Sequence, residues 1–256
     1  MASFEGKVAL VTGGGSGIGQ AAALAFARKG AAVVVTGRRV EAGEETIRLI
    51  EAEGCEGTFI RADVTKEADV KALFDQIIER YGHLDYAFNN AGGGSKFGSM
   101  VDMTEADWTE SLDSNLKSVW LSLKYELPLI AKQGGAIVNN ASVVAYRGQP
   151  FTSFYAASKA GVISLTQSAA IEYAPKGVRV NAVSPAIIET PLTERLAYAV
   201  SGGTNTDPKA QFGAAYPLGR VGQPREVADT VVWLCSDEAS FITAQALMID
   251  GGIMEL

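Results

Sequence analysis

A tyrosine and a lysine lie four residues apart in the segment FYAASKAGV, whose other residues are mostly small or apolar. If the segment is helical, Tyr155 and Lys159 project from one face, a single turn apart. A free tyrosine has a pKa near 10, so only about one in a thousand is ionised at neutral pH. We expect the Lys159 ammonium to lower the pKa of Tyr155 toward proton exchange with an alcohol or carbonyl. Taken alone, such a pair is more typical of a solvated helix surface.

A glycine-rich segment, TGGGSGIG at residues 12–19, directly follows the apolar run KVALVT and precedes a helical pattern. Glycines allow a tight turn and a close approach of the backbone to a pyrophosphate. The first N–H groups of the following helix attract anions. The segment therefore predicts a dinucleotide site that includes Gly13, Ser16, Gly17, Ile18 and Gly19.

Apolar runs alternate with helical patterns along the whole chain. We expect strands near 7–12, 31–37, 57–61, 84–89, 136–140, 178–184 and 246–250, and helices near 20–30, 41–53, 66–81, 105–132, 154–174 and 224–235. Near-continuous apolar strands separated by helices are typical of a parallel sheet that is covered on both faces. The sequence predicts a Rossmann-type α/β fold: a doubly wound, mostly parallel sheet with helices on both faces, in a single domain over 1–256.

Two stretches lack these patterns and are expected to be loops: GGGSKFGS at 92–99 and SGGTNTDPKAQFG at 201–213. Ligands bind at the carboxyl ends of strands in open α/β sheets. The second stretch is therefore either part of a substrate lid, placed near 190–215, or an ordinary surface loop.

The composition excludes several classes of function. With 22 basic and 29 acidic residues, the net charge is −7, which disfavours nucleic acid and anionic membranes as partners. No apolar run could span a bilayer and no leader-like segment is evident, so we expect a soluble, cytoplasmic protein. His83 is the single histidine, so a multi-histidine metal site is excluded. The segment around it, YGHLD, predicts a turn. Cys55 and Cys235 are interpreted as structural, and no metal is expected.

Five features occur in order: TGGGSGIG, NNAG at 89–92, Asn115, Ser142 and the Tyr155–Lys159 pair. On these residues the chain resembles the classical short-chain dehydrogenases/reductases. The resemblance covers nearly the whole length and extends to PLGRVGQPREVA at 217–228 and to DGG at 250–252.

The resemblance implies a catalytic role for four residues. Tyr155 would be the general acid or base, Ser142 would hydrogen-bond the substrate oxygen, and Lys159 would also hold the nicotinamide ribose. Asn115 would kink its long helix and anchor a water that feeds a proton relay.

The second strand ends in Thr36-Gly37-Arg38-Arg39, without the acidic residue that usually binds the adenosine ribose of NAD. An arginine pairs with a 2′-phosphate, so NADP(H) is favoured over NAD(H), with Arg38 and Arg39 as its candidates. Alternatively, Arg38 only stacks on adenine or faces solvent, and NAD(H) serves. The resemblance adds the other cofactor contacts: Asp63 and Val64 at the adenine, Asn90, Ala91 and Gly92 after the fourth strand, and Pro185, Ile188 and Thr190 near the carboxamide and phosphates.

Two alanines depart from the family pattern. Ala186 replaces the usual glycine of PGxxxT, and because alanine adopts positive φ only at a cost, we expect that loop to be shifted. Ala244 replaces another common glycine, in a region that packs between subunits of related tetramers. The resemblance still implies a homo-oligomer, either a tetramer or a dimer.

The sequence therefore predicts an NAD(P)-dependent enzyme that interconverts a secondary alcohol and a ketone, in the reducing direction in a cell. The substrate pocket is expected between Gly93–Phe97, Val143-Val144, Arg147–Phe154 and 190–215, with Phe97, Phe151, Phe154 and Tyr198 as apolar candidates. The alternatives are an NAD(H)-dependent alcohol or sugar dehydrogenase, a non-catalytic dinucleotide sensor, and an epimerase or dehydratase that returns the hydride internally.

Overall fold

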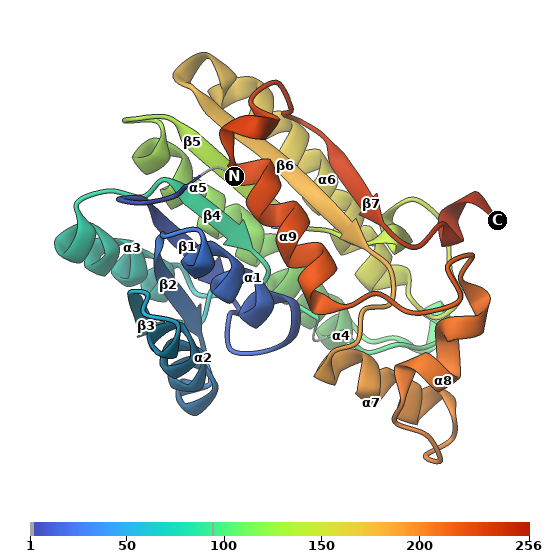
Figure 1. The fold of residues 1–256 in the computed structure, drawn as a ribbon. Coiled ribbons are helices and arrows are strands. Elements are labelled where there is room, and N and C mark those ends of the chain that lie inside the picture. The colour runs from blue at the N-terminus through green and yellow to red at the C-terminus, as the bar shows by residue number, and fades with distance from the viewer. Residues whose placement is uncertain (1–2, 94) are drawn as a thin grey trace.

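A parallel sheet organises the chain in the computed structural model, which describes residues 3–93 and 95–256. Within these residues the sheet has seven strands in the order β3-β2-β1-β4-β5-β6-β7 (Figure 1). The strands are β1 Val8–Thr12, β2 Ala32–Gly37, β3 Gly57–Arg61, β4 Tyr86–Asn89, β5 Gly135–Asn140, β6 Val178–Pro185 and β7 Ala246–Ile249. The order reverses between β1 and β4, and this switch point is where such sheets bind ligands. The Rossmann-type prediction is confirmed.

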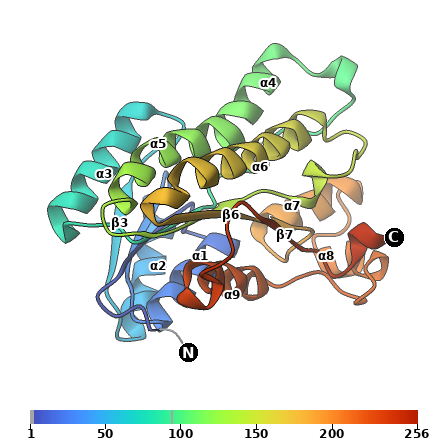
Figure 2. The ribbon, with the colours of Figure 1, turned by 90° about the horizontal axis from the view of Figure 1, so that it is seen from above.

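Helices cover both faces of the sheet (Figure 2). One face carries α1 Gly17–Arg28, α2 Val40–Ala52 and α9 Pro224–Cys235, and the other carries α3 Glu67–Tyr81, α5 Ser118–Ile130 and α6 Ser153–Tyr173. Three further helices, α4 Glu105–Leu112, α7 Pro191–Val200 and α8 Pro208–Phe212, lie toward the carboxyl ends of the strands. The carboxyl edge of the sheet is therefore surrounded by segments that can build a site.

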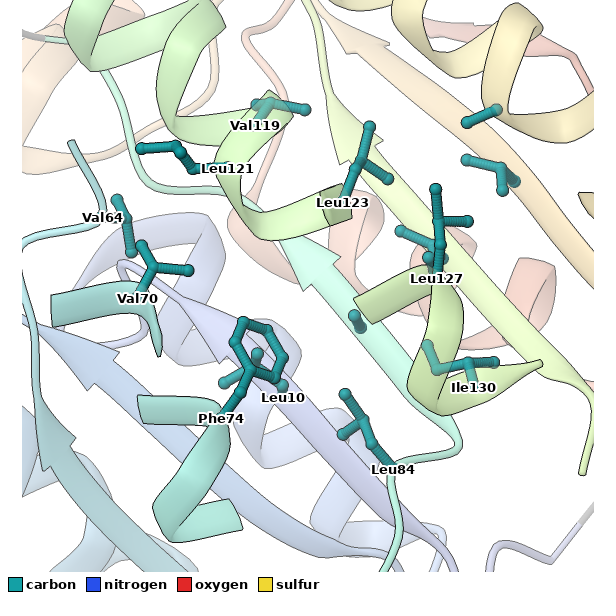
Figure 3. Packing of buried hydrophobic residues seen from close by; sticks show 14 of the residues in the cluster. Leu10, Val64, Val70, Phe74, Leu84, Val119, Leu121, Leu123, Leu127 and Ile130 are labelled. Atoms are coloured by element: carbon teal, nitrogen blue, oxygen red, sulfur yellow. The ribbon is translucent and has the colours of Figure 1, made fainter. Parts of the chain in front are cut away.

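Each face of the sheet has its own apolar core. On the α3, α5 and α6 side, Phe74 packs over Leu10 and beside the Leu127 region of α5 (Figure 3). On the opposite side, Phe26 and Phe88 pack with the buried residues of α9. Each large apolar side chain buried in this way contributes about 1.5–3 kcal/mol. These two cores hold the strand ends in place.

The stretch expected to be one helix over 105–132 is interrupted. A π-helical turn, Asp113–Lys117, separates α4 from α5, with Asn115 at its centre. Such turns are frequent at functional sites because they redirect side chains within a helix. The chain is nevertheless helical from 105 to 130, as predicted, and the π-helical turn lies at Asn115, where the kink was expected.

The expected loop at 201–213 is partly helical. Helix α8 occupies 208–212, and α7 precedes the loop over 191–200. Both helices begin with a side-chain cap followed by proline: Thr190-Pro191 and Asp207-Pro208. Among the described residues, no helix is long and apolar enough to cross a bilayer.

Candidate active site

Helix α6 brings a tyrosine and a lysine to the carboxyl end of β5. The Lys159 side chain is buried, and its ammonium donates a hydrogen bond to the Asn140 carbonyl at 2.6 Å. The same ammonium lies 5.7 Å from the centroid of the Tyr155 ring. Ser142, two residues beyond β5, is buried and lies close enough to the Tyr155 hydroxyl to influence its pKa. The structure therefore brings Ser142, Tyr155 and Lys159 together.

The protonation of this trio differs from the sequence-based expectation. Burial raises the pKa of Tyr155, and the hydrogen bond from Ser142 opposes the rise only in part. Burial also lowers the pKa of Lys159 to about 8. The expectation that Lys159 lowers the pKa of Tyr155 is wrong, because desolvation dominates and the ammonium is directed at the Asn140 carbonyl. At neutral pH Tyr155 is therefore a protonated phenol beside a mostly charged lysine.

The glycine-rich segment forms a cradle between β1 and α1. Gly13 has a φ of +65°, and a Cβ on Gly19 would lie 2.4 Å from the Gly13 carbonyl oxygen. Only glycine fits at Gly19, because no side chain tolerates so close a backbone contact. Ser16, the N-cap of α1, makes no side-chain cap, and the first turn holds no acidic residue. The helix N-terminus keeps its donors and its partial positive charge for an anion, so the cradle fits a dinucleotide pyrophosphate.

The two arginines after β2 differ in their contacts. The Arg39 guanidinium donates from Nη2 to the Ser16 hydroxyl at 2.9 Å, which places a cation at the cradle. Arg38 is exposed, and its charge helps to lower the pKa of Asp63. Burial would raise that pKa, but the hydrogen bonds from Thr65 and the positive charges outweigh it. Asp63 is therefore ionised at the end of β3, next to the buried Val64.

The turn after β4 is tied to the cradle. The Asn90 amide donates to the Thr12 carbonyl at 3.1 Å, and the Thr12 hydroxyl accepts the backbone N–H groups of Asn90 and Ala91, each at 3.0 Å. Gly92 follows next to Asn115, whose Oδ1 accepts the N–H of Gly93 at 2.8 Å. The two cofactor segments predicted from sequence therefore form one hydrogen-bonded unit.

Asn115 is fully buried in the π-helical turn, and both ends of its amide are engaged. Its oxygen holds Gly93, and its nitrogen donates to the Ser95 hydroxyl at 3.2 Å and to the Ser111 carbonyl at 3.0 Å. The side chain thus fixes the segment after β4.

The segment after β6 reaches back to the cradle. Pro185 ends β6, and the buried Ile188 pairs with Gly222 in an isolated bridge. Thr190 caps α7, and its methyl group lies 3.1 Å from where a Cβ on Gly17 would stand. Thr190 is thus in contact distance of the N-terminus of α1.

The two unusual alanines behave differently. Ala186 is not among the non-glycine residues with positive φ in the described chain, and its N–H donates to the Ile249 carbonyl at 3.1 Å. Ala244 does adopt a positive φ, of 61°. Ala244 therefore adopts a left-handed conformation in spite of its Cβ, which costs about 1–2 kcal/mol.

The aromatic residues expected around the pocket separate into two groups. Phe97 meets the Tyr155 ring edge-on, with 6.0 Å between the centroids. Phe154 instead packs edge-on against Trp108 at 5.1 Å, while Phe151 and Tyr198 are largely exposed. Of these four aromatic residues, Phe97 is the one whose ring packs against the Tyr155 ring. Residue 94 of the same expected pocket wall lies outside the described residues.

Sequence reasoning missed a set of buried polar residues behind the site. Glu126, Asn139 and Thr166 are fully buried, and Asn89 nearly so. The available signal was a repeat: β4 and β5 both end in Asn-Asn-Ala, at 89–91 and 139–141. Parallel neighbouring strands with the same polar ending place these amides side by side.

The chain matches known proteins over nearly its whole length. A family model described as Enoyl-(Acyl carrier protein) reductase matches residues 13–254. Cyclohexanol dehydrogenase from Acinetobacter sp. (strain SE19) is 40% identical over 249 residues, which are 97% of this chain and 95% of that protein. The 3-oxoacyl-(acyl-carrier-protein) reductase of Thermotoga maritima is 41% identical over 256 residues, 98% of this chain and 99% of that protein.

A solved structure shows the same fold. The crystal structure of levodione reductase superposes with a TM-score of 0.92 at 36% identity, covering 97% of this chain and 98% of that chain. The similarity therefore includes the sheet, the glycine-rich cradle and helix α6 together.

Proposed function

Since the chain belongs to the short-chain dehydrogenase/reductase family and is an NAD(P)-dependent oxidoreductase of alcohols and ketones, we propose that it interconverts a cyclic secondary alcohol and its ketone with NADP(H). Tyr155 is the general acid or base. The observation that carries this proposal is the grouping of Ser142, Tyr155 and Lys159 at the carboxyl end of β5.

The protonation of the trio suits reduction. Because burial keeps the Tyr155 phenol protonated, it can donate a proton to a ketone oxygen as negative charge develops there. The Ser142 hydroxyl, which lies near the phenol, orients that oxygen. Lys159 supplies a nearby positive charge and a donor for the ribose hydroxyls. A bound nicotinamide would supply the hydride, and the residues of this chain hold and move the proton.

A 2′-phosphate of NADP(H) would be held by Ser16, Arg38 and Arg39. Arg39 lies against Ser16 at the edge of the cradle, and Arg38 is exposed beside it. A guanidinium pairs well with a phosphate dianion, whereas no acidic residue follows β2 to accept ribose hydroxyls. These contacts support NADP(H), and NAD(H) is the alternative.

The proposed substrate follows from one contact and one relative. Phe97 offers an apolar edge beside the Tyr155 ring, which favours a compact apolar substrate over a polar one. The relative that is 40% identical is named for cyclohexanol, a ring-borne secondary alcohol. The 41% identical relative acts on 3-oxoacyl groups, which makes an open-chain 3-oxoacyl thioester the second candidate.

The segment 190–215 is proposed to close over the bound cofactor and substrate. Thr190 lies against Gly17 of the cradle, and a Cβ on Gly93 would lie 3.0 Å from Leu192. Helix α7 therefore contacts both cofactor segments. A salt bridge of 2.9 Å between Lys209 and Glu189 ties α8 to the start of this segment.

We also propose that the enzyme is a homo-oligomer. A hollow of about 420 Å³ opens on the outer surface of α5 and α6 and is lined mainly by apolar residues: Leu112, Leu116, Lys117, Trp120, Gly161, Ser164 and Leu165. Trp120 is half exposed there. An apolar surface of this kind is covered best by a second copy of the chain. Sedimentation of the purified protein would test this.

Nicotinamide absorbance tests the proposed function. Loss of NADPH is measured with cyclohexanone, larger cyclic ketones and a 3-oxoacyl thioester, and each is repeated with NADH. Net NADPH loss with a cyclic ketone supports the proposal, and loss of at least about 100-fold in Tyr155→Phe assigns the proton transfer. Dinucleotide binding without turnover would instead indicate a sensor. A rearranged product with no net cofactor change would indicate an epimerase or dehydratase.

A further inference from the structure

A buried carboxyl group, Glu126 of α5, lies on the same face of the sheet as α6, and the proposed reaction does not use it. It is fully buried, and Asn89 Nδ2 donates to its Oε2 at 2.8 Å. Its other oxygen, Oε1, has no hydrogen-bond partner within residues 3–93 and 95–256. A carboxylate in this position would leave much of its charge unsolvated. Burial raises the pKa of Glu126 to about 8, so the group is mostly neutral at pH 7.

Glu126 begins a chain of hydrogen bonds that crosses four elements. Asn89 of β4 also donates to Asn139 Oδ1 of β5 at 3.0 Å. Asn139 donates in turn to the Thr166 hydroxyl of α6 at 2.9 Å, and that hydroxyl donates to the Val162 carbonyl at 2.7 Å. The chain therefore links α5 to β4, β5 and α6 through buried groups, where hydrogen bonds are strong and costly to lose.

The two asparagines in this series of hydrogen bonds, Asn89 and Asn139, each precede a residue of the candidate active site. Asn89 is followed by Asn90, which binds the cradle, and Asn139 is followed by Asn140, whose carbonyl accepts the Lys159 ammonium. The Asn140 amide also donates to the Asn90 side chain at 3.1 Å. A displacement of either strand end is thereby passed to the position of Lys159.

Helix α6 closes the connection. Thr166 stands seven residues after Lys159, which places both side chains on the same face of the helix. The helix is held to β5 at one point by Thr166 and at another by Lys159. Two fixed points define both the height and the rotation of α6 relative to the sheet.

We propose that Glu126 is a positioning residue for the reaction: through Asn89 and Asn139 it fixes the strand ends that place the Asn140 carbonyl beneath the Lys159 ammonium. This inference rests on the proposed function. The neutral form of the carboxyl group performs this task, because the Asn89 amide needs only an acceptor oxygen.

The charged groups around Glu126 are engaged elsewhere. On its own helix, Lys124 and Tyr125 bind Glu67 of α3 at the surface. From α6, the titratable groups on the face toward the sheet are Tyr155 and Lys159, and Lys159 is committed to Asn140. Among the described residues, the pKa of Glu126 is set by burial and by the Asn89 hydrogen bond alone.

Three variants test the proposal. Glu126→Gln keeps a neutral acceptor of the same shape, Glu126→Leu removes it, and Leu127→Ala is a control that destabilises the same helix without touching the hydrogen-bond chain. For each we would measure kcat, KM for the ketone, the alkaline limb of the kcat profile, and NADPH affinity by nicotinamide fluorescence.

We expect Glu126→Leu to lower kcat about tenfold and to shift the alkaline limb, because Lys159 loses its fixed carbonyl partner. Glu126→Gln should restore kcat to within about twofold of wild type, and Leu127→Ala should lower stability while leaving the alkaline limb in place. If Glu126→Leu keeps the wild-type kcat and limb, or if Glu126→Gln is as impaired as Glu126→Leu, the proposal is overturned. If Glu126→Leu does not fold, the Gln variant decides by the same criterion.

The two proposals fail in different ways. If wild-type protein reduces no ketone, the proposed function has failed, whatever the variants do. The positioning role is then judged from the pH dependence of NADPH affinity in the same variants. It is supported if Glu126→Leu alters that dependence while Leu127→Ala and Glu126→Gln do not, and it is overturned if all three match wild type.

Discussion

Lys159 and Glu126 carry opposite charges when ionised, lie on the same face of the sheet, and are both given a pKa of about 8 by burial. Their states at pH 7 nevertheless differ. Lys159 remains mostly charged and faces Tyr155, whereas Glu126 is mostly neutral and faces only an amide. Desolvation alone therefore does not mark a catalytic group. In the proposed mechanism, the buried charge that matters is the one beside the hydroxyl that exchanges a proton.

The largest expected effect comes from removing the lysine charge. Lys159→Met should lower kcat by at least about 100-fold, because the phenol loses its neighbouring cation. Stability should rise by up to about 3 kcal/mol at pH 7, since the pKa of Lys159 falls from 10.5 to about 8 and the charged form is costly to bury. Urea unfolding and steady-state kinetics measure the two effects. A variant that is both inactive and less stable would contradict this account of Lys159.

The pH dependence of stability separates the two groups further. The pKa of Glu126 is raised from 4.5 to about 8, so the folded protein holds an extra proton between these values and loses stability as pH rises, by up to about 1.4 kcal/mol per pH unit. The depressed pKa of Lys159 acts in the opposite direction, and stability should recover between pH 8 and 10.5.

Urea unfolding from pH 5 to pH 9 measures this profile, which should have a minimum near pH 8. Above pH 9 the raised pKa of the buried Cys235 thiol opposes the recovery. Glu126→Gln should flatten the descending side alone, and Lys159→Met the ascending side alone. Equal profiles for Glu126→Gln and wild type would mean that Glu126 is ionised in the folded protein.

A smaller effect on stability is expected at Thr166, which belongs to the hydrogen bonds between Glu126 and the helix of Lys159. Thr166→Val keeps the shape of the side chain but removes the acceptor for Asn139 and the donor to Val162. The expected loss is about 1–3 kcal/mol and should not depend on pH, because no titratable group is removed. Thermal unfolding at pH 6 and at pH 9 would check it. A loss that changes strongly with pH would show that Glu126 and Thr166 are not independent.

The smallest expected effect is on stability and comes from a substitution at Ala244, away from both Lys159 and Glu126. Ala244→Gly should stabilise the protein by about 1 kcal/mol, because φ is 61° there and glycine adopts this conformation without strain. Ala246→Gly, two residues later in β7, is the matched control and should destabilise by about 0.5–1 kcal/mol. Calorimetry of both variants tests the pair, and two changes of the same sign would refute the explanation from φ.

The fold was predictable from the sequence because its signals are local. Apolar runs and helical periodicity define the seven strands and most helices, with boundaries shifted by a few residues at most. The helices of 190–215 were missed because this region is polar and rich in glycine. Thr190-Pro191 and Asp207-Pro208 are nevertheless signals for the start of a helix.

The proximity of Ser142, Tyr155 and Lys159 was predictable from the sequence, but the pKa shifts of Tyr155 and Lys159 were not. Spacing alone suggested that Tyr155 and Lys159 share a face, and they do. The pKa of Tyr155 depends on desolvation and on where the ammonium is aimed, and both are properties of the folded interior. Glu126 was overlooked because a glutamate within a helix usually faces solvent. Only the tertiary structure shows that this one faces β4.

The paired asparagines at the ends of β4 and β5 also constrain how the strands align. Asn89 lies opposite Asn139 in the sheet and donates to it, and the next two asparagines also bond to each other, with Asn140 of β5 donating to Asn90. Successive side chains point to opposite faces of a sheet, so one pair faces α5 and α6 while the other faces the cradle. A shift of β5 by one residue relative to β4 would place the paired amides on opposite faces of the sheet. Each amide would then be buried among apolar groups without its hydrogen-bond partner. The repeated Asn-Asn therefore favours one register between β4 and β5 over registers shifted by one residue.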